Sequence, residues 1–372
     1  MVKSVYIHIP FCNNICTYCD FCKMYYNSKY VDLYLDELEK EIKSKYNNEL
    51  IETIYIGGGT PSSLSISELE RLFDIIKIFN LDKLVEFSIE CNFDNISNEK
   101  IDLFIKNKIN RISFGLESIN SNNLKILGRE NDTNKIISTI DYCKSRGLNN
   151  INIDLMYGIE NESIEVLRKD LEFVKSLDIT HISTYSLIIE DNTILKINDT
   201  KYIDQELDEE MYKSICSELK DFDHYEISNF SKNKDYYCKH NLVYWNNLEY
   251  YGFGLSASGY IKNTRYTNTR SINKYLNHDY IKNNGIEELD IKDKIIYEII
   301  LNLRTNKGID LDKFKNRYGY SLDELYNYDD LIQRKILVLE NNHLIIPVNL
   351  WYISNSIIVE LLEGEIDEGR FI

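Results

Sequence analysis

The stretch Ile7–Lys23 reads IHIPFCNNICTYCDFCK and holds four of the eight cysteines of the chain, Cys12, Cys16, Cys19 and Cys22. It overlaps and continues the β-branched and aromatic run SVYIHI (4–9), which has the composition of a strand. Loops at the carboxyl ends of parallel strands carry the functional residues of α/β proteins. We therefore expect the four thiols to mark a site, provided that the rest of the chain forms such a sheet.

Five further runs share this strand-like composition, and amphipathic helical patterns separate them. They are TIYIGG (53–58), LVEFSIEC (84–91), RISFGLES (111–118), INIDLMYG (151–158) and HISTYSLI (181–188). Alternation of strand and helix at roughly 30-residue spacing is typical of right-handed βαβ units and a parallel sheet. Six units predict an α/β fold, either a doubly wound sheet or a partial (β/α)6 barrel.

Local patterns also predict details of the helices. SKYVDLYLDELEKEIKSKY (28–46) places apolar residues at spacings near three and four. We expect one buried face made of Val31, Leu33, Leu35, Leu38 and Ile42. Two later helical patterns each follow a serine, Ser65 and Ser163, and we expect a capping box at both.

The pattern changes after about residue 200. A helix is expected over 205–220, followed by HYEISNF and the aromatic stretch HNLVYWNNLEYYGFGLSASGY. From about residue 285, helical patterns and the hairpin VLENNHLIIP indicate a small winged-helix-like domain. We expect a barrel core over 1–200, an α+β extension over 201–284 and this C-terminal domain over 285–372.

Composition disfavours several classes of protein. The 372 residues include 43 basic and 60 acidic ones, a net charge of −17, so an acidic surface would repel nucleic acid. Apolar runs such as IIYEIIL are too short to span a bilayer, and MVKSVYIHIP lacks the apolar core of a secretory signal. We expect a protein of the reducing cytoplasm, where clustered cysteines bind metal or do redox chemistry.

The cysteine spacing, C-x3-C-x2-C, leaves more than one chemistry open. Structural zinc needs four ligands, so Cys22 or His8 would have to complete the set. A thioredoxin-like pair is disfavoured because the motif does not open a clean helix. An iron–sulfur cluster is favoured, because soft thiolates close together on one loop can bind one face of a four-iron cube. Three thiolates would leave one iron open to another ligand.

Seven motifs together resemble the oxygen-independent coproporphyrinogen III oxidase-like branch of the radical SAM superfamily, closest to the HemW family of heme chaperones. They are YIHIPFCNNICTYCDF, IYIGGGTPS, RISFGLES, LGRE, NIDLMYG, YEISNF and HNLVYW, and they cover nearly the whole chain. The resemblance implies a [4Fe-4S] cluster on Cys12, Cys16 and Cys19. It also implies S-adenosyl-L-methionine (SAM) on the open iron, which the reduced cluster cleaves to a 5′-deoxyadenosyl radical. The role of Cys22 stays open.

The resemblance also implies a SAM pocket at the carboxyl ends of the strands. Its lining would be Gly58, Gly59, Thr60, Glu90, Glu117, Arg129 and Asp154. Taken alone, the glycines fit a tight turn, and Arg129 fits either a surface ion pair or a bidentate partner of the SAM carboxylate. Glu117 stands where the family usually has glutamine, so an anion replaces a neutral amide and weaker SAM binding is expected.

HNLVYW carries the heme hypothesis. Neutral imidazole is a common axial heme ligand, and His240 heads a run of aromatic residues that can line an apolar porphyrin site. Without the resemblance, a core histidine in an aromatic packing cluster is the favoured interpretation. His181 and His224 are weaker candidates. The family match implies that His240 binds heme and that recipient hemoproteins, including respiratory ones in membranes, are partners; a homodimer stays open.

Three functions remain in competition. The oxidases carry a longer N-terminal extension and a cysteine two residues after the third ligand; here eleven residues precede Cys12, and Phe21 stands at the second place. We therefore expect a heme chaperone. The alternatives are a coproporphyrinogen III dehydrogenase of porphyrin biosynthesis and a family member that keeps the fold without SAM chemistry.

Overall fold

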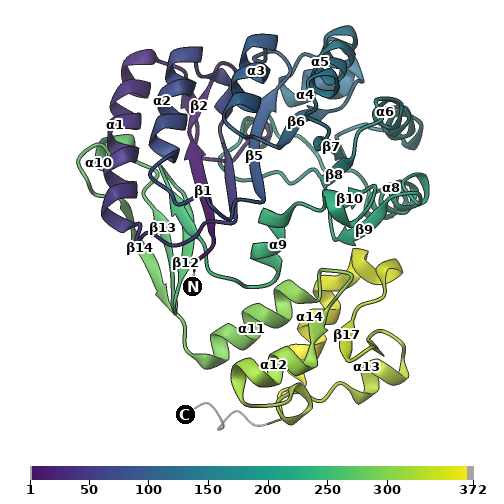
Figure 1. Cartoon of the computed structure of the whole chain (residues 1–372). Coiled ribbons are helices and arrows are strands. Elements are labelled where there is room, and N and C mark those ends of the chain that lie inside the picture. Colours follow the sequence, from purple (N-terminus) through teal and green to yellow (C-terminus); the bar gives the residue numbers. More distant parts are fainter. Residues whose placement is uncertain (1, 367–372) are drawn as a thin grey trace.

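A computed structural model describes residues 2–366 and shows a curved, open nine-stranded sheet with helices packed on one face (Figure 1). The sheet order is β11-β1-β4-β5-β6-β7-β8-β10-β9. Six parallel neighbours form its centre: β1 (Ser4–Ile9), β4 (Thr53–Gly58), β5 (Glu86–Asn92), β6 (Arg111–Glu117), β7 (Ile151–Tyr157) and β8 (His181–Ser186). All six predicted strands are confirmed, and the α/β fold is a partial barrel.

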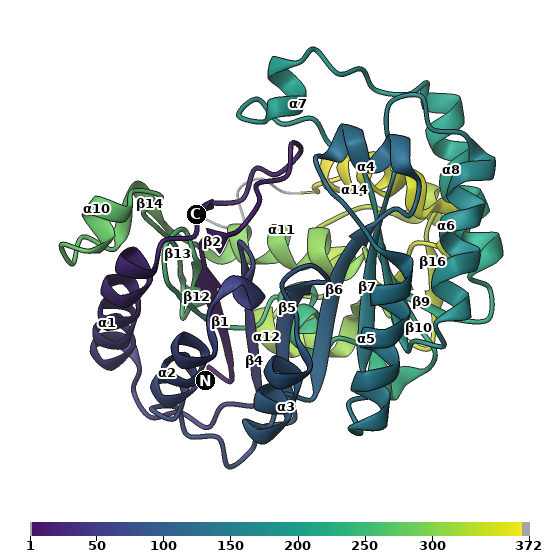
Figure 2. The same cartoon turned by 90° about the horizontal axis from the view of Figure 1, so that it is seen from above.

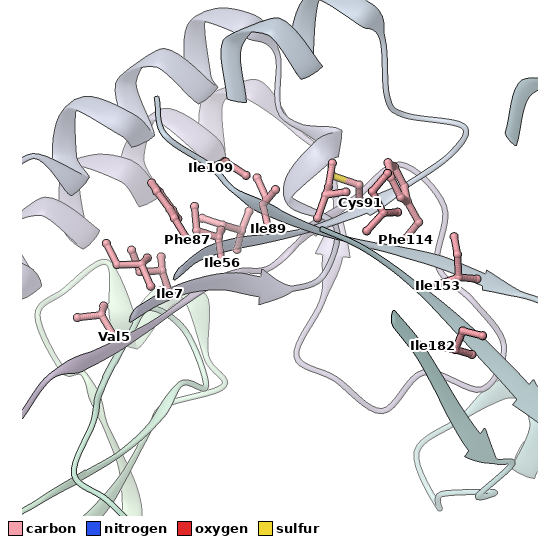
Figure 3. Packing of buried hydrophobic residues seen from close by; sticks show 14 of the residues in the cluster. Val5, Ile7, Ile56, Phe87, Ile89, Cys91, Ile109, Phe114, Ile153 and Ile182 are labelled. Atoms are coloured by element: carbon pink, nitrogen blue, oxygen red, sulfur yellow. The ribbon is translucent and has the colours of Figure 1, made fainter. Parts of the chain in front are cut away.

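The helices that connect the parallel strands cover the outer face of the sheet (Figure 2). They are α1 (Ser28–Lys45), α2 (Ile66–Ile76), α3 (Asn98–Lys106), α4 (Ser121–Leu127), α5 (Thr133–Ser145) and α6 (Ile164–Ser176). Alternate strand residues such as Ile7, Ile56 and Ile153 are fully buried toward these helices (Figure 3). Each such side chain contributes about 1.5–3 kcal/mol by leaving water.

The opposite strand face is polar and borders the barrel interior. Because side chains alternate along a strand, apolar residues facing the helices leave their neighbours facing inward. These inward positions hold Tyr6, His8, Tyr55, Gly57, Glu86, Ser88, Glu90, Arg111, Ser113, Asn152, Asp154, His181 and Ser183. The fold therefore uses its apolar face for stability and its polar face for chemistry.

Two local predictions about helices are corrected. Leu33 is 53% exposed, whereas Tyr34 is buried, so the buried face of α1 runs through Val31, Tyr34, Leu35, Leu38 and Ile42. Two residues turn a helix by about 200°, which places Leu33 opposite Val31. Ser65 and Glu68 form the predicted capping box. At α6 no box forms: the Ser163 side chain makes no cap hydrogen bond, and Val166, three residues on, has no side-chain acceptor for the reciprocal bond.

Residues beyond β8 extend both edges of the main sheet. After α7 (Ile194–Ile197) and α8 (Gln205–Glu218), the antiparallel strands β9 (Asp223–Glu226) and β10 (Asn229–Ser231) join at β8. Helix α9 (Lys239–Trp245), which contains the HNLVYW motif, then leads to β11 (Tyr251–Phe253), which pairs with β1 at the other edge. The chain thus crosses the open side of the barrel at α9.

The remaining elements form two small units. A second sheet consists of β12 (Ser258–Ile261), β13 (Thr264–Asn268) and β14 (Ile281–Glu288), with α10 (Ile272–Tyr275) between the last two. The C-terminal elements are α11 (Ile291–Asn302), β15 (Ile309–Asp310), α12 (Leu311–Tyr318), α13 (Asp329–Gln333), β16 (Val338–Glu340), β17 (His343–Ile345) and α14 (Ser354–Glu363). Figure 1 shows these helices below the barrel and beside α9. The predicted boundary at 284/285 falls within β14, so β14 links the two units.

Membrane insertion through a helix is not supported by the described residues: none of the helices within 2–366 is long and apolar enough to cross a bilayer.

Glu41 on α1 ties the barrel to the second sheet. Its carboxylate is fully buried and accepts hydrogen bonds from Lys45 Nζ at 2.6 Å and from the Gly254 amide at 2.8 Å. Asn268 Nδ2 and Tyr275 Oη donate two more, each at 2.7 Å. A buried carboxylate satisfied by four donors is stable where an unpaired one is not.

We expect Glu41→Ala to lower the free energy of unfolding by about 3–5 kcal/mol, because it leaves buried donors unsatisfied. The matched control is Glu39→Ala on the same helix, which removes a half-exposed pair with Lys43 and should change stability by less than about 1 kcal/mol. Urea denaturation of both variants measures the difference. An equal decrease in the free energy of unfolding in both variants would contradict the role of Glu41 in joining the barrel to the second sheet.

Candidate functional site

The cysteine loop projects from the carboxyl end of β1 and is closed at its base by backbone hydrogen bonds. The two-residue strands β2 (Phe11–Cys12) and β3 (Met24–Tyr25) pair in parallel. The Met24 amide donates to the Pro10 carbonyl at 2.7 Å, and the Tyr26 amide donates to the Cys12 carbonyl at 2.9 Å. This closure holds the intervening segment, with its cysteines, above the barrel mouth.

Three thiols act on one another electrostatically and the fourth lies apart. Burial raises the pKa of Cys12 to about 11, and the nearby Cys16 and Cys19 thiols add to that rise. Cys22 is also buried, but its Sγ faces the Arg270 carbonyl at 3.7 Å. Cys12 thus feels the charges of Cys16 and Cys19, whereas the Cys22 thiol faces the Arg270 carbonyl.

Hydrogen-bond donors and the closely packed glycine turn surround the sulfurs of Cys12 and Cys16. Thr60 Oγ1 lies 3.5 Å from Cys12 Sγ, and Arg129 donates to Cys16 Sγ at 3.4 Å. A side chain at Gly59 would put its Cβ 3.0 Å from Cys12 Sγ, so only glycine leaves that space free. Donors of this kind stabilise thiolates and tune iron–sulfur clusters. The residues present therefore fit a cluster.

The same thiols do not form a site for a single metal ion. Among residues 2–366, no three His, Cys, Asp or Glu side chains converge as ligands of one ion. Thiolates that bind separate irons of a cube lie farther apart than ligands that share one ion. The three thiols are therefore not converged on one ion in this structure.

The glycine turn after β4 is fastened to the cysteine loop. The Gly59 amide donates to the Ile9 carbonyl at 2.8 Å, and the Thr60 amide donates to the Phe11 carbonyl at 2.9 Å. Gly58 has φ of +115°, a conformation that L side chains rarely adopt, and a Cβ there would lie 2.5 Å from the His8 ring. The turn is therefore restricted to glycine by both backbone angle and space.

Two inward carboxylates lie beneath this turn. Glu90 accepts from the Gly58 amide at 3.0 Å and from Tyr55 Oη at 2.9 Å. Burial, with repulsion from Asp154, raises the Glu90 pKa to about 7. Asp154 accepts from Asn152 and Ser113, and burial raises its pKa as well. Carboxylates held this way can bind an ammonium or hydroxyl group at the barrel mouth.

Arg129 and Glu117 form an ion pair beside the cysteine loop. Arg129 Nη1 lies 3.2 Å from Glu117 Oε1, and both side chains are nearly buried. Arg129 Nη2 also donates to the Gly115 carbonyl at 2.7 Å, and Tyr18 Oη donates to Glu117 at 2.9 Å. Glu117 adopts φ of 62°. The guanidinium expected to meet the SAM carboxylate is therefore already paired with a carboxylate of the chain.

His240 lies inside the molecule at the other end of the strands. Its Nδ1 is 2.9 Å from Thr53 Oγ1 and its Nε2 is 2.8 Å from Tyr244 Oη. The ring stacks on Tyr55 with centroids 5.4 Å apart. Burial lowers the His240 pKa to about 3, so the imidazole is neutral, as an axial ligand must be. Metal ligation through Nε2 requires Tyr244 to move.

Glu86 anchors the start of α9 and was missed by sequence reasoning. Its carboxylate accepts from the Lys239 amide at 2.7 Å and the His240 amide at 3.0 Å. Tyr55 and Thr53, which contact His240 directly, were missed as well. A local signal existed, because polar residues at alternate positions of otherwise apolar strands indicate an inward face. The hydrogen bonds from Glu86 to α9 join residues more than 150 positions apart, so no local sequence pattern predicts them.

Other predicted residues lie in structural roles. His181 is fully buried between Asn152 Oδ1 at 2.6 Å and Tyr225 Oη at 2.7 Å. His224 stacks on Phe230 with centroids 4.0 Å apart. Ser118, which follows Glu117 and was not among the predicted site residues, donates to Asp170 on α6 at 2.6 Å. None of these three contacts the residues grouped around the cysteine loop.

The chain matches known proteins along most of its length. Residues 6–174 match the radical SAM superfamily, and residues 289–347 match the HemN C-terminal domain. The heme chaperone HemW of Lactococcus lactis is 34% identical over 98% of both chains. HemW of Bacillus subtilis is 37% identical over 87% of this chain and 89% of that one. The solved structure of Escherichia coli coproporphyrinogen III oxidase (HemN) has a TM-score of 0.83 at 19% identity, covering 96% and 89% of the two chains.

Fold, cysteine loop and family match together define a radical SAM protein of the HemN-like type. Within that class, the chain belongs to the HemW family, because two curated members are 34% and 37% identical to it over most of their lengths. The resemblance predicted from the seven motifs is thereby confirmed.

We expect Gly58→Ala to destabilise the fold by several kcal/mol, through backbone strain and overlap with His8. Gly147→Ala is the matched control: Gly147 has φ of +85° with open space around it, so strain alone should lower stability by about 1–2 kcal/mol. Thermal denaturation compares the two. A Gly58 variant no less stable than the Gly147 variant would show that the turn tolerates a side chain.

Proposed function

We propose that this protein is a heme chaperone that binds a [4Fe-4S] cluster, SAM and heme and delivers heme to recipient hemoproteins. The relatives named heme chaperone HemW support this proposal over nearly the whole chain. The structural observation that carries the heme part is the HNLVYW helix. There a neutral, buried His240 is held by Glu86 through the backbone and by Thr53 and Tyr244 through its ring.

Cys12, Cys16 and Cys19 would hold the cluster, which when bound supplies the electron for SAM cleavage. Around it, Thr60 and Arg129 donate to the sulfurs, and the glycine turn packs directly against the cysteine loop. Gly58, Gly59, Thr60, Glu90, Glu117, Arg129 and Asp154 would line the SAM site. Because Glu117 already pairs with Arg129, a SAM carboxylate has to compete with Glu117 for the guanidinium.

Iron binding tests the cluster. After anaerobic reconstitution with iron and sulfide, we expect about four irons per chain, as a [4Fe-4S] cluster requires, and an EPR signal that shifts on adding SAM. Cys16→Ser should lose most of this iron, whereas Cys22→Ser should retain it, because the Cys22 thiol faces Arg270. Iron loss from the Cys22 variant would make that cysteine a ligand. A wild-type protein without iron would overturn the cluster.

Heme titration tests His240. We expect His240→Ala to weaken heme binding about tenfold or more, a loss of about 1.4 kcal/mol or more, and to change the heme absorption spectrum. His181→Ala is the matched control, since His181 is equally buried with both ring nitrogens engaged. Both variants remove a core imidazole, so only a specific heme effect separates them. Equal heme affinity in wild type and His240→Ala would remove His240 from the site.

Coproporphyrinogen III dehydrogenation is the alternative function, and the HemN structure shares only its fold with this chain at 19% identity. Turnover of coproporphyrinogen III by the reconstituted protein would establish that reaction and displace the chaperone proposal.

A further inference from the structure

A cavity of about 770 Å³ lies at the amino ends of β1, β4 and β5, where α9 faces the C-terminal elements. We call it the α9 cavity. Its barrel side includes Ser4, Thr53 and Val85, its α9 side includes Leu242 and Val243, and α11 and α12 contribute Ile291, Lys294, Arg317 and Tyr318. The volume lies in the upper half of the range of small-molecule sites, which is about 300–1,000 Å³.

Aliphatic side chains stay accessible in this cavity. Val85, Leu248 and Ile291 line it and are 52%, 43% and 38% exposed. Leu242 and Val243 of α9 add to the same wall. Exposed aliphatic groups gathered in a concave site mark a place for an apolar ligand surface.

The charge of the cavity lining is opposite to that of the chain. Five cationic residues and two carboxylates line it: Lys3, Lys239, Lys262, Lys294 and Arg317, with Glu52 and Glu249. That lining carries +3 on a chain of net charge −17. An excess of cations in a cavity attracts anions.

Two of these lysines are available to a ligand. Lys3 pairs with Glu52 at 2.6 Å, and Arg317 pairs with Glu298. Within the described part of the chain, the ammonium groups of Lys239 and Lys262 form no ion pair: Lys239 Nζ donates to the Asp235 carbonyl at 3.1 Å, and Lys262 bonds Glu249 through its backbone amide at 2.7 Å. The cavity thus combines an apolar wall with unpaired ammonium groups.

His240 lies directly behind the cavity wall. Thr53 lines the cavity, and its hydroxyl is 2.9 Å from His240 Nδ1. Lys239, which also lines it, is the residue before His240. A ligand in the cavity is therefore separated from the imidazole by one side chain.

We propose that the α9 cavity is the heme site, with the macrocycle on the Val85, Leu242 and Leu248 wall and the carboxylates at Lys239 and Lys262. This inference rests on the proposed function and specifies where the cargo binds. Of the ligands in that function, heme combines a large apolar plane with two carboxylates. For His240 to ligate the heme iron, Thr53 and Tyr244 would have to give up their hydrogen bonds to its ring.

Metal-free protoporphyrin IX tests the cavity without involving iron ligation. We expect Lys239→Glu/Lys262→Glu to weaken its binding at least tenfold, measured by porphyrin fluorescence on the full chain. The control Lys169→Glu/Lys220→Glu makes the same change in net charge on exposed residues of α6 and the end of α8 and should bind as wild type does. Wild type should also bind protoporphyrin dimethyl ester more weakly, and raised salt should weaken binding of the acid.

The outcomes separate the two proposals. If wild type binds heme and protoporphyrin but the cavity variant binds both equally well, the α9 cavity is not the site and the chaperone function stands. If both double variants lose binding alike, net charge and not the cavity governs affinity, and the cavity assignment is overturned. If wild type binds neither tetrapyrrole, the proposed function and the cavity fail together.

Discussion

The close approach of the glycine turn after β4 to the loop after β1 is the constraint on which the rest of the site depends. Two backbone hydrogen bonds join them, from the Gly59 and Thr60 amides to the carbonyls of Ile9 and Phe11. A side chain at either Gly58 or Gly59 would overlap neighbouring atoms. This contact places Thr60 against Cys12 Sγ and sets the Gly58 amide on the Glu90 carboxylate.

Inward-facing side chains connect this mouth with the opposite end of the barrel. Tyr55 donates to Glu90 and stacks on His240, so one residue contacts both regions. Glu86 holds the backbone of α9, which places His240 against Thr53. The polar face of the sheet is thus largely buried, and there the pKa of the Glu90 carboxyl rises and the pKa of the His240 imidazole falls, so that both shift toward their neutral forms.

Local pattern predicted the local structure and little of the tertiary pairing. β1 and β4 occupy the predicted residues, because alternation along a strand is visible over six residues. Leu33 was predicted to be buried because it is apolar. Its position on the helix, about 200° around from Val31, places it in solvent instead. Cys22 stands three residues from Cys19, yet its thiol faces Arg270, 248 residues away; His240 and Thr53 are 187 residues apart. No spacing rule within one segment encodes such contacts, and the resemblance supplied the site residues that patterns could not.

The lengths of β1 and β4 set a separation between the two ends of the barrel. Each strand has six residues, which at about 3.3 Å per residue spans about 20 Å. Heme in the proposed α9 cavity, beside Thr53, would therefore lie about one strand length from the cysteine loop. Such a layout suits a carrier, because it keeps the transported molecule apart from the place where iron–sulfur chemistry would occur.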